Sequence, residues 1–241
     1  MVFKDNGGFY QTVLAAARTL FDGGLPPRDD REALVHWILL RQNRQKGFIF
    51  YPSPQDWQAG IYLFSGERPR TKFLAENAVE LETLRLLARL DPGNTEVQRV
   101  FRQANQRLFP LCFANSCTQG ECAQASLAFL RYITAFDADF YLSRIKKGLE
   151  RLKEARAGDG QWKGFPFYFT LLWLTEIPAE LALAEMAYAS TRPPRLVTGS
   201  LKPGDAFSQV RKAILRQAVR TVQAARPGGV PALPLANVLG L

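Results

Sequence analysis

The chain has 241 residues, of which 47% are hydrophobic and 22% charged, and it carries a formal net charge of +9. This composition is typical of a globular protein and excludes intrinsic disorder, collagen-like repeats and a coiled-coil rod. Three cysteines cannot all pair with one another, which also excludes a secreted disulfide scaffold.

The sequence contains no recognisable targeting or membrane segment. Its first residues lack the basic region and apolar core of a signal peptide. The most apolar stretch, residues 165–174, is too short to cross a bilayer. We therefore expect a cytoplasmic protein with reduced thiols and no transmembrane segment.

Helical periodicity dominates the chain, and no alternating strand pattern of useful length appears. Residues 48–65 contain two prolines and six aromatic residues and are predicted to be irregular. Residues 191–204 read as a linker, and the tail at 227–241 is apolar but rich in Pro and Gly. The pattern predicts an all-α protein. A first helix is expected over residues 8–21, and a second begins at a cap formed by Asp29 or Asp30 and ends at Gly47. Further helices are expected over residues 72–90, 95–109, 119–136, 140–155, 165–177, 179–190 and 206–225.

Three Leu-rich segments recur along the chain. They begin at Thr83, Ser126 and Thr170, so their spacings are 43 and 44 residues. A period of this length fits a pair of helices with loops. Each pair would contain an apolar inner helix and a more charged outer helix, such as residues 140–155. The repeat predicts a ring of helix pairs or an open solenoid of the HEAT type, although Leu-rich helices also match one another by coincidence.

The third of these segments follows a distinctive loop. Residues 158–177 resemble the repeat unit of the prenyltransferase and terpene-cyclase α/α toroids (squalene-cyclase-type repeats), in which Asp-Gly-x-Trp precedes an aromatic inner helix. Residues 159–162, Asp-Gly-Gln-Trp, match that loop, and residues 117–127 and 76–80 resemble two further inner-helix starts. The resemblance implies an α/α toroid of inner and outer helix rings over residues 1–241. Fewer helices are predicted than that family uses, so the ring would be incomplete or small.

The catalytic motifs of that family are absent. Its protein prenyltransferases hold zinc with an Asp, a Cys two residues later and a distant His. Here Gln161 stands two residues after Asp159, and no histidine lies downstream. Its cyclases use Asp-x-Asp-Asp, and residues 137–140 lack the last Asp. The resemblance therefore implies a binding fold and does not assign a reaction.

An α/α toroid would direct the starts of its inner helices toward one mouth of a central cavity. Aromatic residues there could line the cavity or could simply pack in the core. We expect the cavity to bind an apolar or isoprenoid-like ligand, or the fold to serve as a scaffold for a protein partner. The predicted ligand-binding residues are Asn77, Glu80, Glu121, Cys122, Phe167, Tyr168 and Trp173.

The cysteines Cys112, Cys117 and Cys122 lie five residues apart. This spacing differs from the Cys-x2-Cys pattern of zinc and iron–sulfur sites. We therefore expect small buried side chains near a helix start, with no metal and no cofactor. The remaining hypothesis is a thiolate stabilised by the N-terminus of the helix over 119–136.

Other candidate catalytic groups are few. Asp137 and Asp139 lie between two predicted helices, where capping is the simplest role and a Mg²⁺ ion carrying a diphosphate is the alternative. His36 is the only histidine and has no identifiable catalytic partner. No catalytic residue is assigned, and whether the protein is an enzyme stays open.

Positive charge is concentrated in residues 192–241, which hold eight Lys or Arg residues and one Asp. This region combines a basic helix with the apolar Pro/Gly tail. Lys212, Arg216 and Arg220 share one helix face and form a candidate anion-binding surface. The alternative function is therefore a HEAT-like solenoid that binds nucleic acid or an acidic partner through this face, although a solvated helix face is the simpler explanation of the charge.

Overall fold

The computed structural model describes residues 7–202, 204–225 and 234–239, and the fold within these ranges is all-α, with no β-strand. None of the described helices is both long and apolar enough to span a membrane. The helices are α1 (Phe9–Gly23), α2 (Arg28–Leu39), α3 (Pro54–Ala59), α4 (Lys72–Leu90), α5 (Thr95–Leu108), the 3-10 helix η1 (Cys112–Asn115), α6 (Cys122–Asp137), α7 (Leu142–Glu154), α8 (Phe167–Glu176), α9 (Ala179–Ala189), α10 (Pro194–Thr198), α11 (Ser208–Ala224) and α12 (Pro234–Leu239).

The predicted helices agree with the observed ones to within a few residues, except that the second helix was expected to continue to Gly47, whereas α2 ends at Leu39. α4 has the predicted bounds, whereas α6 begins at Cys122 because Gly120 adopts a left-handed φ of 54° just before it. Two short helices lie in segments predicted to be irregular: α3 in residues 48–65 and α10 in the linker. Most of the predicted tail lies outside the described residues, apart from α12.

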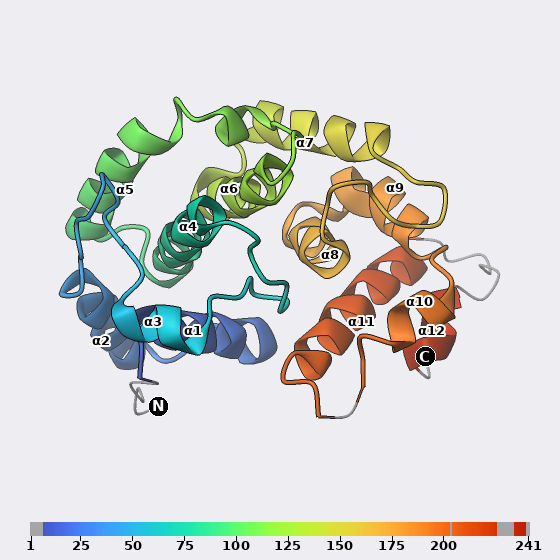
Figure 1. The fold of residues 1–241 in the computed structure, drawn as a ribbon, viewed down its shortest axis with the longest axis horizontal. Helices are drawn as coiled ribbons and strands as arrows, with labels where there is room; N and C mark the ends of the chain where they lie inside the picture. The colour runs from blue at the N-terminus through green and yellow to red at the C-terminus, as the bar shows by residue number, and fades with distance from the viewer. Residues whose placement is uncertain (1–6, 203, 226–233, 240–241) are drawn as a thin grey trace.

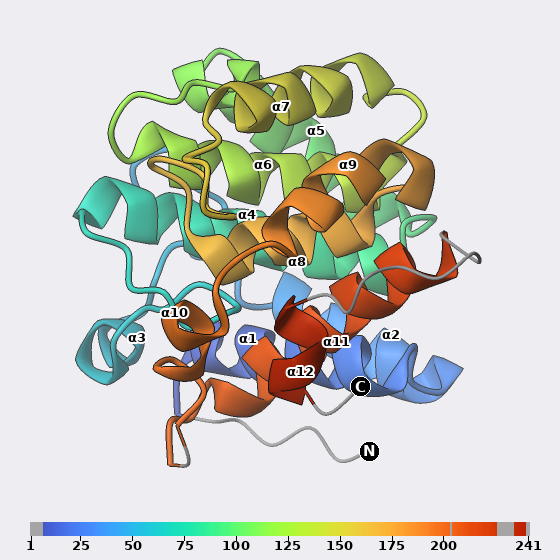
Figure 2. The ribbon, with the colours of Figure 1, turned by 90° about the vertical axis from the view of Figure 1, so that its right-hand side faces the viewer.

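Helices α4, α6 and α8 form the interior of the molecule (Figure 1). α5, α7 and α9 lie on their outer side, and α1 and α11 flank the row, with α1 packed on α4 and α11 packed on α8. The Leu-rich segments that begin at Thr83, Ser126 and Thr170 fall in α4, α6 and α8, which contact one another in that order. The segment over residues 60–67 runs beside these helices (Figure 2).

Burial follows the distribution of apolar residues. Almost every residue of α4 from Leu74 to Leu90 is buried, because its neighbours cover it on nearly all sides. α7 instead buries one stripe, formed by Ile145, Gly148 and Leu152, and exposes its lysines. The predicted solvent-facing helix over 140–155 is thus confirmed as an amphipathic outer helix.

Asp56 joins the starts of α1 and α3. Its buried carboxylate accepts hydrogen bonds from the backbone N–H of Tyr10 at 2.8 Å and of Ser53 at 2.8 Å, and from the Ser53 hydroxyl at 2.7 Å. The Ser53 hydroxyl in turn accepts from the Asp56 N–H, which completes a capping box. One carboxylate therefore caps α3 and anchors the N-terminus of α1.

Replacing Asp56 with alanine is expected to lower the free energy of unfolding by about 2–4 kcal/mol, because several buried donors lose their acceptor. Urea unfolding followed by circular dichroism measures this change. Gln58→Ala is the matched control, since Gln58 is exposed on the same helix. Equal stability of the two variants would contradict the anchoring role of Asp56.

Candidate functional site

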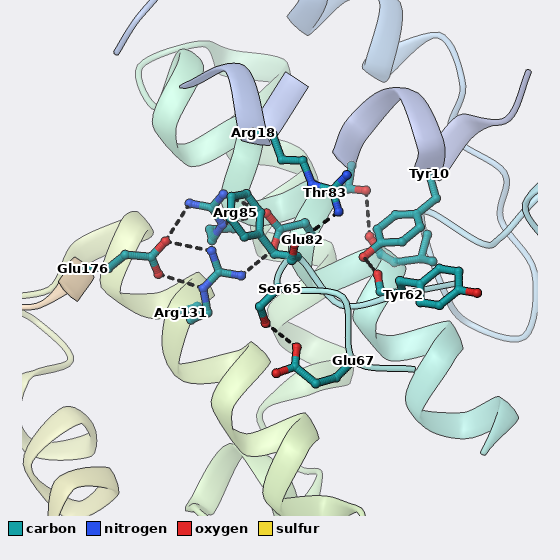
Figure 3. A network of polar contacts seen from close by, with 12 residues as sticks. Tyr10, Arg18, Tyr62, Ser65, Glu67, Glu82, Thr83, Arg85, Arg131 and Glu176 are labelled. Atoms are coloured by element: carbon teal, nitrogen blue, oxygen red, sulfur yellow. Dashed lines mark hydrogen bonds and ion pairs between the residues drawn. The ribbon is translucent and has the colours of Figure 1, made fainter. Parts of the chain in front are cut away.

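A closed network of two arginines and two glutamates joins the interior helices (Figure 3). Arg131 of α6 donates to Glu176 of α8 at 2.7 and 2.8 Å and to Glu82 of α4 at 2.8 Å. Arg85 donates to Glu82 at 2.9 and 2.7 Å and to Glu176 at 3.3 Å. The four side chains together are electrically neutral, and we call them the Arg–Glu quartet.

The charges of the quartet depend on one another because they are withdrawn from water. Burial alone would raise the pKa of Glu82, but Arg131 and Arg85 outweigh burial and hold it below its ordinary value. Burial alone would lower the pKa of Arg131, but Glu176 and Glu82 raise it above its ordinary value. Both groups are therefore ionised at neutral pH, and each stabilises the charge of the others.

A pocket of about 270 Å³ lies against this quartet, between α1, α4, α6, α8 and α11. Its walls include Arg85, Arg131 and Glu176, whose charges are already paired inside the protein. Phe64 occupies the space behind the quartet, with its ring 5.3 Å from the Arg131 guanidinium. We assign the quartet a structural role, since its hydrogen-bonding groups are used within the fold.

A larger pocket, of about 660 Å³, lies at the opposite ends of α6 and α8, where these helices begin. It falls within the size range of small-molecule sites. Polar groups from three segments converge on it, and we call it the entry pocket. Its lining residues are Glu67, Arg68, Arg70, Thr118, Gly120, Glu121, Gln124, Gln161, Gly164, Phe165 and Pro166.

Several polar groups of the entry pocket have unused hydrogen-bonding capacity. Oε1 of Glu121 and Oε1 of Gln124 are buried atoms without a hydrogen-bond partner among the described residues. Arg68 and Arg70 are exposed, and neither forms an ion pair with a described carboxylate. Buried acceptors without donors are costly, so they point to a ligand that supplies donors.

Glu67 is the most perturbed carboxyl of the entry pocket. Burial raises its pKa above the ordinary value, although hydrogen bonds from Ser65 and from the Phe169 backbone and the charge of Arg211 oppose this rise. The Ser65 hydroxyl donates directly to Glu67 (Figure 3). A carboxyl whose pKa is raised by burial in a pocket is a frequent feature of functional sites.

The predicted ligand-binding residues fall into separate places. Asn77 and Glu80 are fully buried, and both contact Arg107 of α5. The Arg107 guanidinium donates a hydrogen bond to Oδ1 of Asn77 and forms an ion pair with Glu80. Burial raises the pKa of Glu80 above its ordinary value, although the charge of Arg107 opposes this rise. Glu121, whose other carboxylate oxygen accepts from Thr71, is the one predicted residue that lines the entry pocket.

The predicted aromatic residues belong to the packed core. Phe167 stacks on Trp162, and the Tyr168 hydroxyl lies 2.6 Å from the Ser200 hydroxyl. Trp173 is fully buried and donates to Thr134 at 3.3 Å. None of these three lines either pocket described above.

The Asp-Gly-Gln-Trp loop has a structural explanation in this fold. Asp159 accepts from the Gln161 N–H at 3.1 Å, and buried Trp162 donates to Glu185 of α9 at 2.9 Å. Gly160 adopts a φ of +77°, and a Cβ there would lie 2.6 Å from the Arg192 backbone nitrogen. The loop therefore needs a glycine at this position.

The basic face of α11 is partly exposed. Arg216 and Arg220 are exposed and Lys212 is half-buried, while the opposite face, with Ile214 and Val222, is buried as predicted. Asp137 accepts from the Phe140 N–H at 3.0 Å in the turn between α6 and α7, but α7 has Tyr141 as its N-cap and no side-chain capping bond, so the expected capping of that helix is not observed. Asp139 and His36 are exposed.

The cysteine prediction was wrong. Instead of being buried and separate, Cys112 is exposed, Cys117 and Cys122 are partly exposed, and the three sulfurs lie within 4.8 Å of one another. Only Cys122 belongs to α6, so helical geometry does not separate them. Burial and the hydrogen bond with Cys112 raise the pKa of Cys122 to about 12, which argues against a thiolate stabilised by the helix N-terminus.

Sequence reasoning also missed Arg68, Arg70 and the Arg–Glu quartet. The quartet had a detectable signal, because Arg131 and Glu176 interrupt segments that are otherwise apolar. The two arginines had no such signal, since they lie in an irregular segment without periodicity.

Comparisons with family models, with curated proteins and with solved structures find nothing that matches this chain.

Proposed function

We propose that this chain is a ligand-binding protein, built as an incomplete ring of helix pairs, whose entry pocket binds a small molecule with an anionic group and a hydrogen-bond donor. The resemblance to the prenyltransferase and terpene-cyclase toroids supports the ring. The order of contacts among α4, α6 and α8 is consistent with it. The ligand is supported by the polar lining of the entry pocket.

The proposed ligand class rests on one observation: the entry pocket holds both cationic hydrogen-bond donors and acceptor oxygens that have no partner among the described residues. Arg68 and Arg70 supply positive charge and donors for a phosphate or carboxylate. The orphan oxygens of Glu121 and Gln124 accept from an amino or hydroxyl group. A purely apolar ligand would leave the two buried oxygens unsatisfied and would use neither arginine, so we replace the expected apolar ligand with a polar one.

O-Phosphoethanolamine is a suitable probe because it carries both groups on a short chain. We expect it to bind more tightly than inorganic phosphate or ethanolamine alone in isothermal titration calorimetry. The Arg68→Gln/Arg70→Gln double variant should lose at least about tenfold in affinity, because two charge-assisted contacts are removed. Arg99→Gln, a change of a partly exposed residue on α5 that forms an ion pair with Glu96, is the control and should bind normally.

The remaining outcomes separate the alternatives. Equal affinity of the double variant and the wild type would contradict the assigned pocket. Tight binding of geranyl diphosphate with no binding of phosphoethanolamine would return the ligand to the isoprenoid class. Salt-dependent DNA binding that is lost when Lys212, Arg216 and Arg220 are changed to alanine would instead favour the solenoid alternative.

A further inference from the structure

The three cysteines form a compact cluster at the surface. The sulfurs of Cys112 and Cys122 are 3.5 Å apart, and all three sulfurs lie within 4.8 Å of one another. Cys112 begins η1, Cys117 lies in the following loop, and Cys122 begins α6. Among the described residues, this is the one group of three or more potential metal ligands that converge so closely.

The backbone that carries the cluster is held by bonds that do not involve sulfur. The Ser126 hydroxyl of α6 donates to the carbonyls of Phe113 at 3.0 Å and Cys117 at 2.8 Å. Arg144 of α7 donates to the Ala114 carbonyl at 2.5 Å. Ser116 adopts a φ of +60°, which folds the chain back between two of the cysteines. The cluster is thus preorganised by its surroundings.

The sulfur distances match a thiolate metal site. Zinc–sulfur bonds of about 2.3 Å at a tetrahedral angle place two sulfurs about 3.8 Å apart. The Cys112–Cys122 sulfur separation is 3.5 Å and no pair of sulfurs is more than 4.8 Å apart, so small side-chain rotations would bring all three sulfurs to that distance. Soft thiolate ligands select zinc and similar thiophilic ions over magnesium or calcium.

We propose that Cys112, Cys117 and Cys122 bind a Zn²⁺ ion through three thiolates, with a fourth coordination position open to solvent. Each thiol releases its proton to water as its sulfur binds the metal, so three thiolates and Zn²⁺ give a site of net charge −1. The exposure of Cys112 leaves room for a water molecule as fourth ligand. Arg144, which is bonded to the loop between the first two cysteines, supplies positive charge nearby.

The proposed zinc site does not depend on the ligand proposed for the entry pocket. Two of its cysteines are, however, sequence neighbours of residues that line that pocket. Thr118 and Glu121, which line that pocket, lie next to Cys117 and Cys122 in the sequence. A metal that joins the three cysteines would hold this wall of the pocket. Metal binding can nevertheless be measured without any ligand for the pocket.

Cobalt(II) is the appropriate probe because its thiolate complexes have a charge-transfer band that grows with the number of bound sulfurs. The full-length protein, kept reduced by a phosphine and shown by thiol titration to hold three free thiols, is titrated with Co²⁺. We expect one ion per chain, a band intensity of three thiolates, and displacement of Co²⁺ by one equivalent of Zn²⁺. Absence of the band in the fully reduced protein would overturn the proposal.

Variants test the assignment of each ligand. Cys117→Ser should reduce the band to the intensity of two thiolates and weaken Zn²⁺ binding by at least about tenfold. Gln119→Ala, an exposed change in the same loop, should leave both unchanged. Circular dichroism checks that each variant is folded. An unchanged band in folded Cys117→Ser, or a loss of binding in Gln119→Ala, would contradict the three-cysteine site.

Discussion

Arg131→Met is expected to lower the free energy of unfolding by about 3–5 kcal/mol, because it leaves buried negative charge without its main partner. Arg131 is 1% exposed and holds Glu82 and Glu176 at the same time. After the change, Arg85 alone faces both carboxylates, so the remaining group carries a net charge of −1. Urea unfolding at pH 7 measures the loss.

Two further variants identify the stranded charge as the cause. Arg131→Met combined with Glu82→Gln leaves one arginine and one glutamate, so the double variant should be more stable than Arg131→Met alone. Arg151→Met removes an exposed ion pair with Glu154 on α7 and should change stability very little. If the double variant lost as much stability as the two single changes added together, the quartet would not act as a charge network.

The effect of Arg131→Met depends on pH in a defined direction. In the wild type, the lowered pKa of Glu82 contributes stability above its ordinary pKa of 4.5, and this contribution is lost as pH falls through the lowered value. In the variant, the excess negative charge is expected to raise the pKa of the Glu82 and Glu176 carboxyls. Protonation of one of them then removes the buried net charge and restores part of the lost stability. The difference in stability between wild type and variant should therefore be largest near pH 7 and should shrink toward pH 4.

Trp173→Ala is expected to cost about 3–5 kcal/mol in the free energy of unfolding, since it removes the largest side chain between three helices. Trp173 is fully buried in α8 and donates to Thr134 of α6. Its ring also touches α7, where a Cβ on Gly148 would lie 3.0 Å from Cη2 of Trp173. The cavity left by the smaller side chain would remove packing contacts from α6, α7 and α8.

Trp57→Ala provides the matched control for this change. Trp57 is 37% exposed on α3, with the Lys72 ammonium 5.5 Å from the centre of its ring, so its removal should cost much less. Thermal unfolding followed by circular dichroism compares the two variants. A small loss of stability in Trp173→Ala would indicate that Trp173 lines a space already open to ligands, as the sequence had suggested.

The sequence by itself determined most of the helices and the division between interior and outer ones. These depend on the periodicity of apolar residues within one segment, as in α4, whose bounds were predicted, and in α7, whose lysines face water. The Asp-Gly-Gln-Trp loop was also visible as a local pattern, although its role in contacting Glu185 was not.

Only the tertiary structure decided which side chains meet. Arg131 lies 49 residues from Glu82 and 45 from Glu176, and no local pattern encodes those distances. The entry pocket likewise combines Arg68 with Glu121 and Gln161 from separate segments. The cysteines converge because a loop with two left-handed residues, Ser116 and Gly120, precedes α6, whereas spacing along a regular helix would have kept them apart. Periodicity reports how each helix is buried, but sites arise from the packing between helices.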